Sequence, residues 1–281
     1  IVVQWDNNDV ANGMYYKAPR NASIEVNDRN FSPDYAAVET TATDASGAGV
    51  SAPGASAWTQ LEPRQKWGCS VSFASELHYT MRITATDLAG NSAETYEEPE
   101  FVIDMTAPVV SISNVSQYAA YSDVVAPTIS YSDTNFDPTF TTYLLTGGRS
   151  GANAYVNGIN EQDEATSRTV SFPDFEHTLE MDDVYVLDAQ MTDLAGNQAQ
   201  QSVTFSVNRY GSTYLLTDES GNMLGSYLNR PQDVVVHEIN PSGLDQSAGH
   251  AEVVHDSEVA SLTPNADYQV GTGIDSDSWS D

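Results

Sequence analysis

The residues of this sequence that are best suited to chemistry are its histidines, its single cysteine and its many acidic side chains. His250 and His255 bracket the segment HAEVVH, which resembles a zinc-binding helix. Such a helix needs two histidines four residues apart and a glutamate directly after the first, whereas these are five apart and Ala251 follows the first. A metal pair would also need a third ligand, so we interpret both as histidines of a loop or strand.

Calcium is a second chemistry that the acidic residues suggest. Asp275 and Asp277 alternate as at the start of a calcium-binding loop, but Ser280 stands where that loop requires glycine. Calcium at an acidic junction between domains is a further alternative, and its candidates are Asp6, Asn7, Asn8, Asp9, Asp104 and Asp218. Solvated acidic loops are the simpler explanation. We therefore predict no metal site and no cofactor.

The sequence gives little support for catalysis by a nucleophile or by a pair of carboxylates. Cys69 is the single cysteine, so it forms no internal disulfide. A catalytic thiolate needs a basic environment, to which only Arg64 and Lys66 contribute nearby, and we interpret Cys69 as a small apolar residue. Asp182 and Asp183 are adjacent, so in a strand they point to opposite faces. Because the sequence also lacks nucleophile-elbow, phosphate-loop and dinucleotide-binding motifs, we predict no catalytic residue and no enzymatic activity.

An excess of acidic residues limits the partners of the chain. Asp and Glu number 40 against 10 Lys and Arg, which gives a formal net charge of −30. Such a field repels a nucleic-acid backbone and an anionic membrane surface. No apolar run approaches the ~20 residues of a membrane-spanning helix. We predict no nucleic-acid partner and no membrane insertion, which leaves an extracellular glycan or protein as the candidate ligand of a monomeric fragment.

The elements that position these residues have the periodicity of β-strands. In YTMRITATD, Tyr79, Met81, Ile83 and Ala85 fall on one face, and VYVLDAQMTD repeats the alternation. No long amphipathic helix is evident. Short strands bounded by turn residues, in units of about 100 residues, predict an all-β chain of antiparallel two-sheet sandwiches.

The sequence also repeats itself. TDLAGN at 86–91 returns at 192–197, and NDRNFSPDY at 27–35 corresponds to SDTNFDPTF at 132–140. QDVVVHEIN at 232–240 resembles the start of a third copy, but no third TDLAGN follows it. A period of this length indicates tandem domains. We predict modules at 1–106, 107–208 and 209–281, of which the third is incomplete.

The repeated hexamer has the composition of a hairpin turn. Asp87 suits the first corner because its carboxylate accepts from backbone amides further along the turn. Gly90 suits the fourth corner because it adopts positive φ without a Cβ clash, and Asn91 then re-enters the strand. A metal-ligand role for the Asp and Asn residues is the alternative, but turn chemistry already accounts for each residue. In the second copy the same roles fall to Asp193, Gly196 and Asn197.

Two pairs of aromatic residues are candidates for special roles. Tyr79 and Tyr185 each precede the aspartate of the turn by eight residues, near the start of the penultimate strand. Sandwich folds often place a tyrosine corner there, whose hydroxyl bonds to the backbone, and a core aromatic is the alternative. Trp58 and Trp67 have no counterpart in the second copy, so they are the candidates for ligand contact, with core filling as the alternative.

Several of these segments resemble the repeated immunoglobulin-like modules of large bacterial cell-surface proteins. The D-x-T-A-P junction that runs from Asp104 to Pro108 and the D-x-A-G-N turn are typical of such modules, and NRYGSTY at 208–214 resembles the opening of a following one. The resemblance covers essentially the whole chain and implies Ig-like sandwiches. It implies no shared catalytic residue, because such modules serve as spacers, adhesive surfaces and accessory domains of secreted enzymes.

The resemblance and the failed motif searches together favour one interpretation. The chain is then a non-enzymatic tandem Ig-like region of a bacterial cell-surface or secreted protein, and it acts as a stalk, a spacer or an adhesive module. The alternative is an accessory, carbohydrate-binding region of a larger secreted hydrolase. A wall-binding segment in the parent protein would favour the first interpretation, and a hydrolase domain would favour the second.

Overall fold

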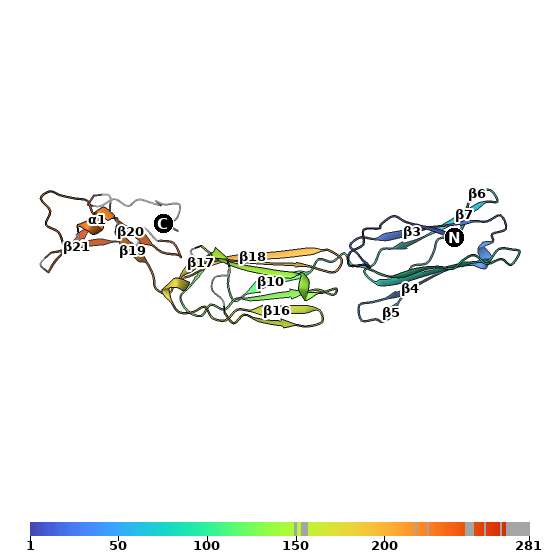
Figure 1. Ribbon diagram of the computed structural model, residues 1–281, viewed down its shortest axis with the longest axis horizontal. Helices are drawn as coiled ribbons and strands as arrows, with labels where there is room; N and C mark the ends of the chain where they lie inside the picture. Colours follow the sequence, from blue (N-terminus) through green and yellow to red (C-terminus); the bar gives the residue numbers. More distant parts are fainter. Residues whose placement is uncertain are drawn as a thin grey trace.

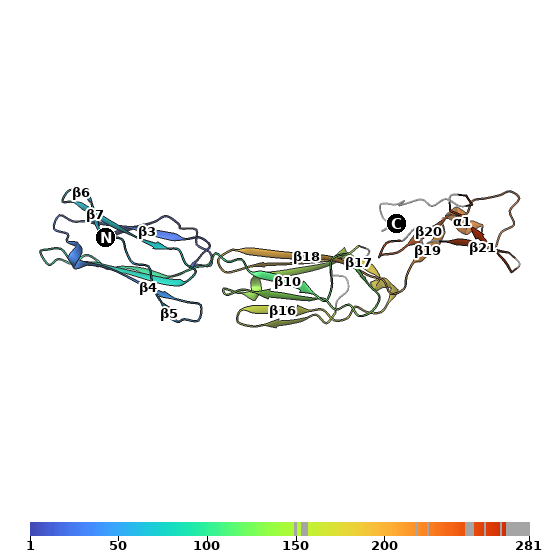
Figure 2. The same cartoon turned by 180° about the vertical axis from the view of Figure 1, so that it is seen from behind.

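A computed structural model shows an elongated molecule whose β-sheets follow one another along the long axis (Figure 1). The same succession is evident from behind, with the amino-terminal residues and the residues after 208 in opposite halves (Figure 2). The structure describes residues 1–148, 151–152, 157–216, 218–223, 225–244, 250–255, 257–264 and 266–267.

Two sheets in the amino-terminal part, which we call the first sheet pair, enclose two clusters of buried hydrophobic side chains. Their strand orders are β1-β3-β7-β6 and β2-β9-β8-β4-β5. Strand β8 buries Tyr79, Met81 and Ile83 against Phe73 and Phe101 from β7 and β9, as the alternation of YTMRITATD predicts. The elements are β1 (Val2–Trp5), β2 (Tyr15–Tyr16), β3 (Arg20–Asn27), η1 (Pro33–Tyr35), β4 (Ala36–Thr43), β5 (Gly49–Val50), β6 (Thr59–Glu62), β7 (Lys66–Phe73), β8 (His78–Ala85) and β9 (Tyr96–Ile103).

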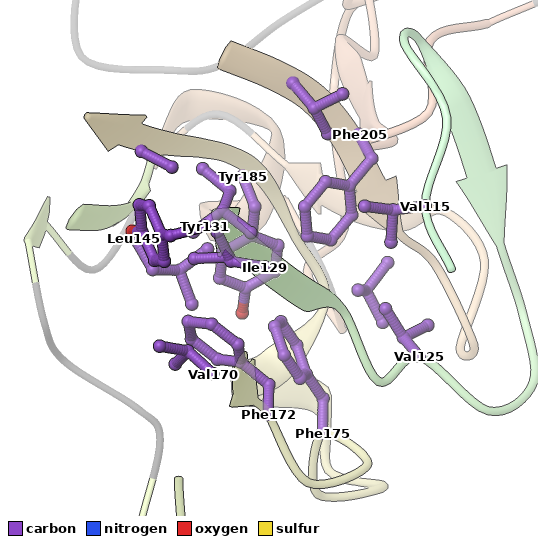
Figure 3. Close-up of a cluster of buried hydrophobic side chains, with 14 of the residues drawn as sticks. Val115, Val125, Ile129, Tyr131, Leu145, Val170, Phe172, Phe175, Tyr185 and Phe205 are labelled. Carbon is purple, nitrogen blue, oxygen red and sulfur yellow. The ribbon is translucent and has the colours of Figure 1, made fainter. Parts of the chain in front are cut away.

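A second sheet pair repeats this arrangement, with strand orders β10-β12-β16-β15 and β11-β18-β17-β13-β14. Its core gathers Tyr131 from one sheet, Tyr185 and Phe205 from the other, and Phe172 and Phe175 from the segment that follows β16 (Figure 3). The elements are β10 (Val109–Ser113), β11 (Ala119–Tyr121), β12 (Thr128–Ser132), η2 (Pro138–Phe140), β13 (Thr141–Gly147), β14 (Gly151–Ala152), β15 (Asn160–Asp163), β16 (Ser167–Ser171), η3 (Leu179–Met181), β17 (Asp183–Thr192) and β18 (Gln198–Val207). An all-β fold of Ig-like sandwiches, as predicted from the sequence, is thereby confirmed.

One feature of both sheet pairs departs from a purely antiparallel sandwich. The opening segment of each pair first joins one sheet through β1 or β10 and then crosses to the other sheet. There β2 runs parallel to β9, with Tyr16 beside Ile103, and β11 runs parallel to β18, with Tyr121 beside Val207. The parallel strands span only two or three residues, too few for an alternation to be recognised in the sequence.

The described residues after 208 form two small antiparallel sheets, β19-β20 and β21-β22. The described elements are β19 (Thr213–Leu216), α1 (Asp218–Asn222), β20 (Val236–Ile239), β21 (Ala251–His255) and β22 (Glu258–Leu262). The segment 232–240, which resembles the start of a third copy in the sequence, contains β20. Val234, Val253 and Val254 are exposed. None of the described helices has the length and apolar character that crossing a membrane requires.

Candidate functional site

The repeated hexamer forms the same hairpin turn in both sheet pairs. Asp87 Oδ1 accepts from the amide nitrogens of Ala89 (2.9 Å) and Asn91 (2.8 Å), and Asp87 Oδ2 accepts from Asn91 Nδ2 (2.9 Å). These bonds, that of the Asn91 side chain above all, hold the pKa of Asp87 below its ordinary value. Gly90 has a φ of 88°, a left-handed conformation that favours glycine.

The second hairpin has matching geometry. Asp193 Oδ1 accepts from the Asn197 amide nitrogen (2.8 Å), and Asp193 Oδ2 accepts from Asn197 Nδ2 (2.9 Å). Gly196 has a φ of 91°. The two hairpins therefore differ in what surrounds them rather than in how they are built.

The two tyrosines ahead of these turns bond to the backbone. Tyr79 Oη donates to the Ser75 carbonyl oxygen (3.0 Å), and Tyr185 Oη donates to the Met181 carbonyl oxygen (3.0 Å). Both rings are buried in the cores. Burial raises the pKa of Tyr79, as expected for a phenol that remains a neutral donor. This is the geometry of a tyrosine corner.

An acidic residue beside each tyrosine corner holds the segment that leaves the sheet pair. Glu76 Oε1 accepts from the Met105 amide nitrogen (3.0 Å) and from Thr106 Oγ1 (2.8 Å). Asp182 accepts in the same way from the amide nitrogens of Arg209 (2.9 Å) and Tyr210 (2.8 Å). Sequence analysis did not single out either carboxylate for this role, although each lies three residues before its tyrosine.

Asp104 joins the first sheet pair to the second, and we call this contact the first junction. Asp104 directly follows β9 and is only 4% exposed. Its Oδ2 accepts from Asn135 Nδ2 (2.7 Å), and its carbonyl oxygen accepts from Asn197 Nδ2 (2.9 Å). Asn12 Nδ2, from a turn of the first sheet pair, donates to the Leu194 carbonyl oxygen (2.8 Å).

Three carboxylates meet at the first junction. One oxygen each from Asp104, Asp133 and Asp193 lies within 4.8 Å of the others, and Asp104 and Asp193 are buried. Burial raises the pKa of Asp133 to about 6; the Asn135 amide opposes the rise, and the charges of Asp104 and Asp193 add to it. Burial also raises the pKa of Asp104. The site therefore resists holding three negative charges at once.

Such a cluster can be stabilised chemically in two ways. Among the described residues, no salt bridge joins any of the three carboxylates to a lysine or arginine. Sharing of protons would remove charge, whereas a hard divalent cation, which prefers carboxylate oxygens, would compensate it. The residues that would hold such a cation are Asp104, Asp133 and Asp193, and they fit it in donor type. The cation would supply charge compensation and would bridge the two sheet pairs.

The other candidates for calcium do not join this cluster. Asp6 instead accepts from the Asn21 amide nitrogen (2.7 Å) and from Asn21 Nδ2 (2.6 Å), and this side chain holds its pKa low. Asp275 and Asp277 lie outside the described residues. Of the three clustered carboxylates, only Asp104 was among the junction candidates named from the sequence. Asp193 was considered as a ligand only through the alternative for the repeated turn, which turn chemistry displaced, and Asp133 was missed. The repeated D-x-N and D-x-x-G-N patterns mark these residues as parts of turns, but they do not show that the turns meet.

The remaining candidates lie away from the junction. Trp58 and Trp67 are half-buried and pack against Phe31, with ring centroids 5.0 Å and 5.7 Å from it. Their packing corresponds to the core-filling alternative, and their ligand contact stays a prediction. Cys69 is buried, and its burial raises the pKa of the thiol to about 11, as suits a small apolar residue.

A shallow hollow of about 490 Å³ lies on the outer face of β13, β17 and β18. It is lined by the side chains of Thr142, Leu144, Asp188, Gln190, Gln200 and Ser202. The equivalent face of the first sheet pair carries Arg82, which bonds to Glu39 (3.3 Å) and Glu97 (3.4 Å) across the strands. Asp188 takes the place of Arg82 in the second pair, so these cross-strand bridges are missing there.

Comparison with curated proteins finds no match for this chain. A model of the bacterial Ig-like domain family (group 3) matches residues 66–211, just over half of the chain. The matched region runs from β7 through the first junction to the end of the second sheet pair, so it includes both hairpin turns and all three clustered carboxylates. The chain therefore belongs to the bacterial Ig-like domain family, group 3.

Proposed function

We propose that the chain is a non-enzymatic stalk or spacer of a bacterial cell-surface or secreted protein, built from modules at 1–106, 107–208 and 209–281. The observation that carries the proposal is the first junction. There Asn135 and Asn197 of the second sheet pair bond directly to Asp104 at the end of the first. A spacer needs such a contact, because modules joined by a free linker would not hold a distal domain at a distance.

The linker itself is short and tied down. Glu76 binds Met105 and Thr106, and β10 begins at Val109 directly after Pro108. Proline fixes its own φ and restricts the residue before it, so few backbone torsions remain free between the two sheet pairs. The junction therefore transmits the direction of one module to the next.

The charge of the chain suits this role. A formal net charge of −30 keeps copies of the protein apart and favours a monomer. It equally disfavours nucleic acid and anionic surfaces, so an adhesive face would take a neutral or basic glycan or protein ligand.

Small-angle scattering on the 281-residue chain tests the proposal. We expect an extended particle with a narrow distribution of shapes. The double variant Asn135→Ala/Asn197→Ala should bend more freely at the first junction, whereas Asn27→Ala/Asn160→Ala, two exposed asparagines on strands, serves as the matched control. A compact wild-type particle, or a double variant as stiff as the control, would contradict the stalk.

A second candidate function is that of a carbohydrate-binding accessory region of a larger secreted hydrolase. The hollow on the second sheet pair favours it, because side-chain amides and carboxylates bind the hydroxyls of a sugar. Affinity electrophoresis with xylan, mannan and soluble starch tests this candidate. Retardation that Gln190→Ala/Gln200→Ala abolishes and Asn27→Ala leaves unchanged would support it; equal mobility in all gels would exclude these three polymers.

A further inference from the structure

The end of the first sheet pair that lies opposite the first junction has the same construction as the end that receives Asp104. Asp28 Oδ1 accepts from the Asn30 amide nitrogen (2.6 Å), and Asp133 Oδ1 accepts from the Asn135 amide nitrogen (2.7 Å). We call the set Asp28, Asn30, Asp87 and Asn91 the outer face, and the set Asp133, Asn135, Asp193 and Asn197 the inner face.

In each face the hairpin turn bonds in the same way to the loop that carries the D-x-N residues. The Leu88 amide nitrogen donates to the Asn30 carbonyl oxygen (3.0 Å), and the Leu194 amide nitrogen donates to the Asn135 carbonyl oxygen (3.0 Å). The internal bonds of the two hairpins also agree to within 0.1 Å at the Asp–Asn pairs. The outer face is therefore preorganised like the inner one.

The two faces differ in what covers them. On the inner face, Ala195 is only 2% exposed and Asn135 is half-buried, since the first sheet pair lies against them. On the outer face, Leu88 is 65% exposed, and Ala89 and Asn30 are exposed as well. Within the part of the chain that the structure describes, the Asn30 side chain has no hydrogen-bond partner, whereas Asn135 Nδ2 binds Asp104.

We propose that the outer face is a docking surface for the carboxyl-terminal end of another Ig-like module, specifically for an aspartate that closes its last strand. Asn30 Nδ2 donates to the carboxylate of that aspartate and Asn91 Nδ2 to its carbonyl oxygen, as Asn135 and Asn197 do for Asp104. The exposed Leu88 packs beneath the incoming strand end. The proposal rests on the proposed stalk function and names the partner of one of its ends.

This contact is small, and it places a third carboxylate beside Asp28 and Asp87, so it is weak between separate molecules. It needs the high effective concentration that a covalent tether supplies. The test is therefore a chain in which residues 1–109 are repeated ahead of Ile1. Val3 pairs with Ile24 in the first sheet pair as Ile112 pairs with Ile129 in the second, so Val3 corresponds to Ile112 and Ile1 corresponds to Val110. A repeated segment that ends at residue 109 therefore precedes Ile1 with the natural spacing. A Glu94→Asp substitution in the added copy gives its peptides a different mass from those of the internal copy.

Hydrogen exchange of the amides at 88–91 in the internal copy gives the readout. We expect exchange about fivefold slower, or more, than in the unmodified chain. Asn30→Ala in the internal copy should abolish that protection in the extended chain and change nothing in the unmodified one, where its side chain has no partner. Asn27→Ala is the control.

Unchanged exchange at 88–91, or equal protection with Asn30→Ala, would overturn the docking surface. Neither result would touch the stalk, because scattering from the unmodified chain tests that function separately.

Discussion

Replacing Asp133 by asparagine should stabilise the second sheet pair at neutral pH when divalent cations are chelated. The substitution removes one of three facing carboxylates and keeps the shape of the side chain. Its Oδ1 can still accept from the Asn135 amide, and its new Nδ2 can donate to Asp104 or Asp193. The variant therefore loses charge repulsion without losing a hydrogen bond.

The magnitude follows from the pKa of Asp133, which burial raises from 3.8 to about 6. A carboxyl group with a raised folded-state pKa binds its proton more tightly when folded. Its contribution to stability is therefore fully present below about pH 4 and is lost as the pH rises to about 6. A pKa difference of about two corresponds to about 3 kcal/mol. Because Asp133 is half-buried rather than fully buried, solvent screening reduces this to on the order of 1–2 kcal/mol.

Hydrogen exchange of the β17 amides measures the effect, because exchange from the core reports the free energy of unfolding of the unit around it. In chelator at pH 7.5, Asp133→Asn should exchange about 5 to 30 times more slowly than the parent. Near pH 3.5 the two should agree. Asp137→Asn in the same loop is the control, and it should exchange faster than the parent at pH 7.5. Bonds from the Thr139 side chain and amide hold the pKa of Asp137 low, so its ionised form stabilises the folded state.

Faster exchange of Asp133→Asn than of the parent in chelator would refute this reasoning. Calcium adds a second comparison. Sequence analysis predicts no metal site, and identical exchange of the parent in calcium and in chelator would agree with it. Slower exchange of the parent in calcium, lost in Asp133→Asn, would instead assign a cation to the three carboxylates through its preferential binding to the folded state.

Three further predictions concern the turn, the tyrosine corner and the carboxyl-terminal part. Gly196→Ala should cost about 1 kcal/mol in denaturant unfolding, because a Cβ there meets no neighbour and the cost is that of the left-handed φ alone. Tyr185→Phe should cost on the order of 1–3 kcal/mol, since it leaves the buried Met181 carbonyl without its donor, and an unchanged transition would show that the ring alone matters. Amides at 236–239 should exchange far faster than those at 183–191, because a two-stranded sheet has little protected core; equal protection would mean that 209–281 is a complete domain.

The sequence predicts the local parts of this structure better than the junction. The hairpin at Asp87 and Gly90 is recognisable because six consecutive residues determine it, and the strand at 78–85 because its apolar residues alternate. The carboxylate cluster is different. Asp104 follows the last strand of one sheet pair, Asp133 lies in a loop of the next, and Asp193 belongs to its final hairpin. Only the stacking of two folded units brings the three together, so no local pattern contains their proximity.

The junction after the second sheet pair shows what the first one lacks. Strand register places Asn208 at the position of Asp104 and Asn240 at that of Asp133. Asn208 Nδ2 donates to Asn240 Oδ1 (2.7 Å), a direct bond that two neutral amides can form because each carries both a donor and an acceptor. Two ionised carboxylates are acceptors only, so Asp104 and Asp133 cannot pair until a proton or a cation lies between them. The contact between these two positions is thus made by complementary amides at the second junction, whereas at the first it needs charge compensation beside the bonds that Asn135 and Asn197 make to Asp104. The residues at two equivalent positions determine which of the two contacts is made.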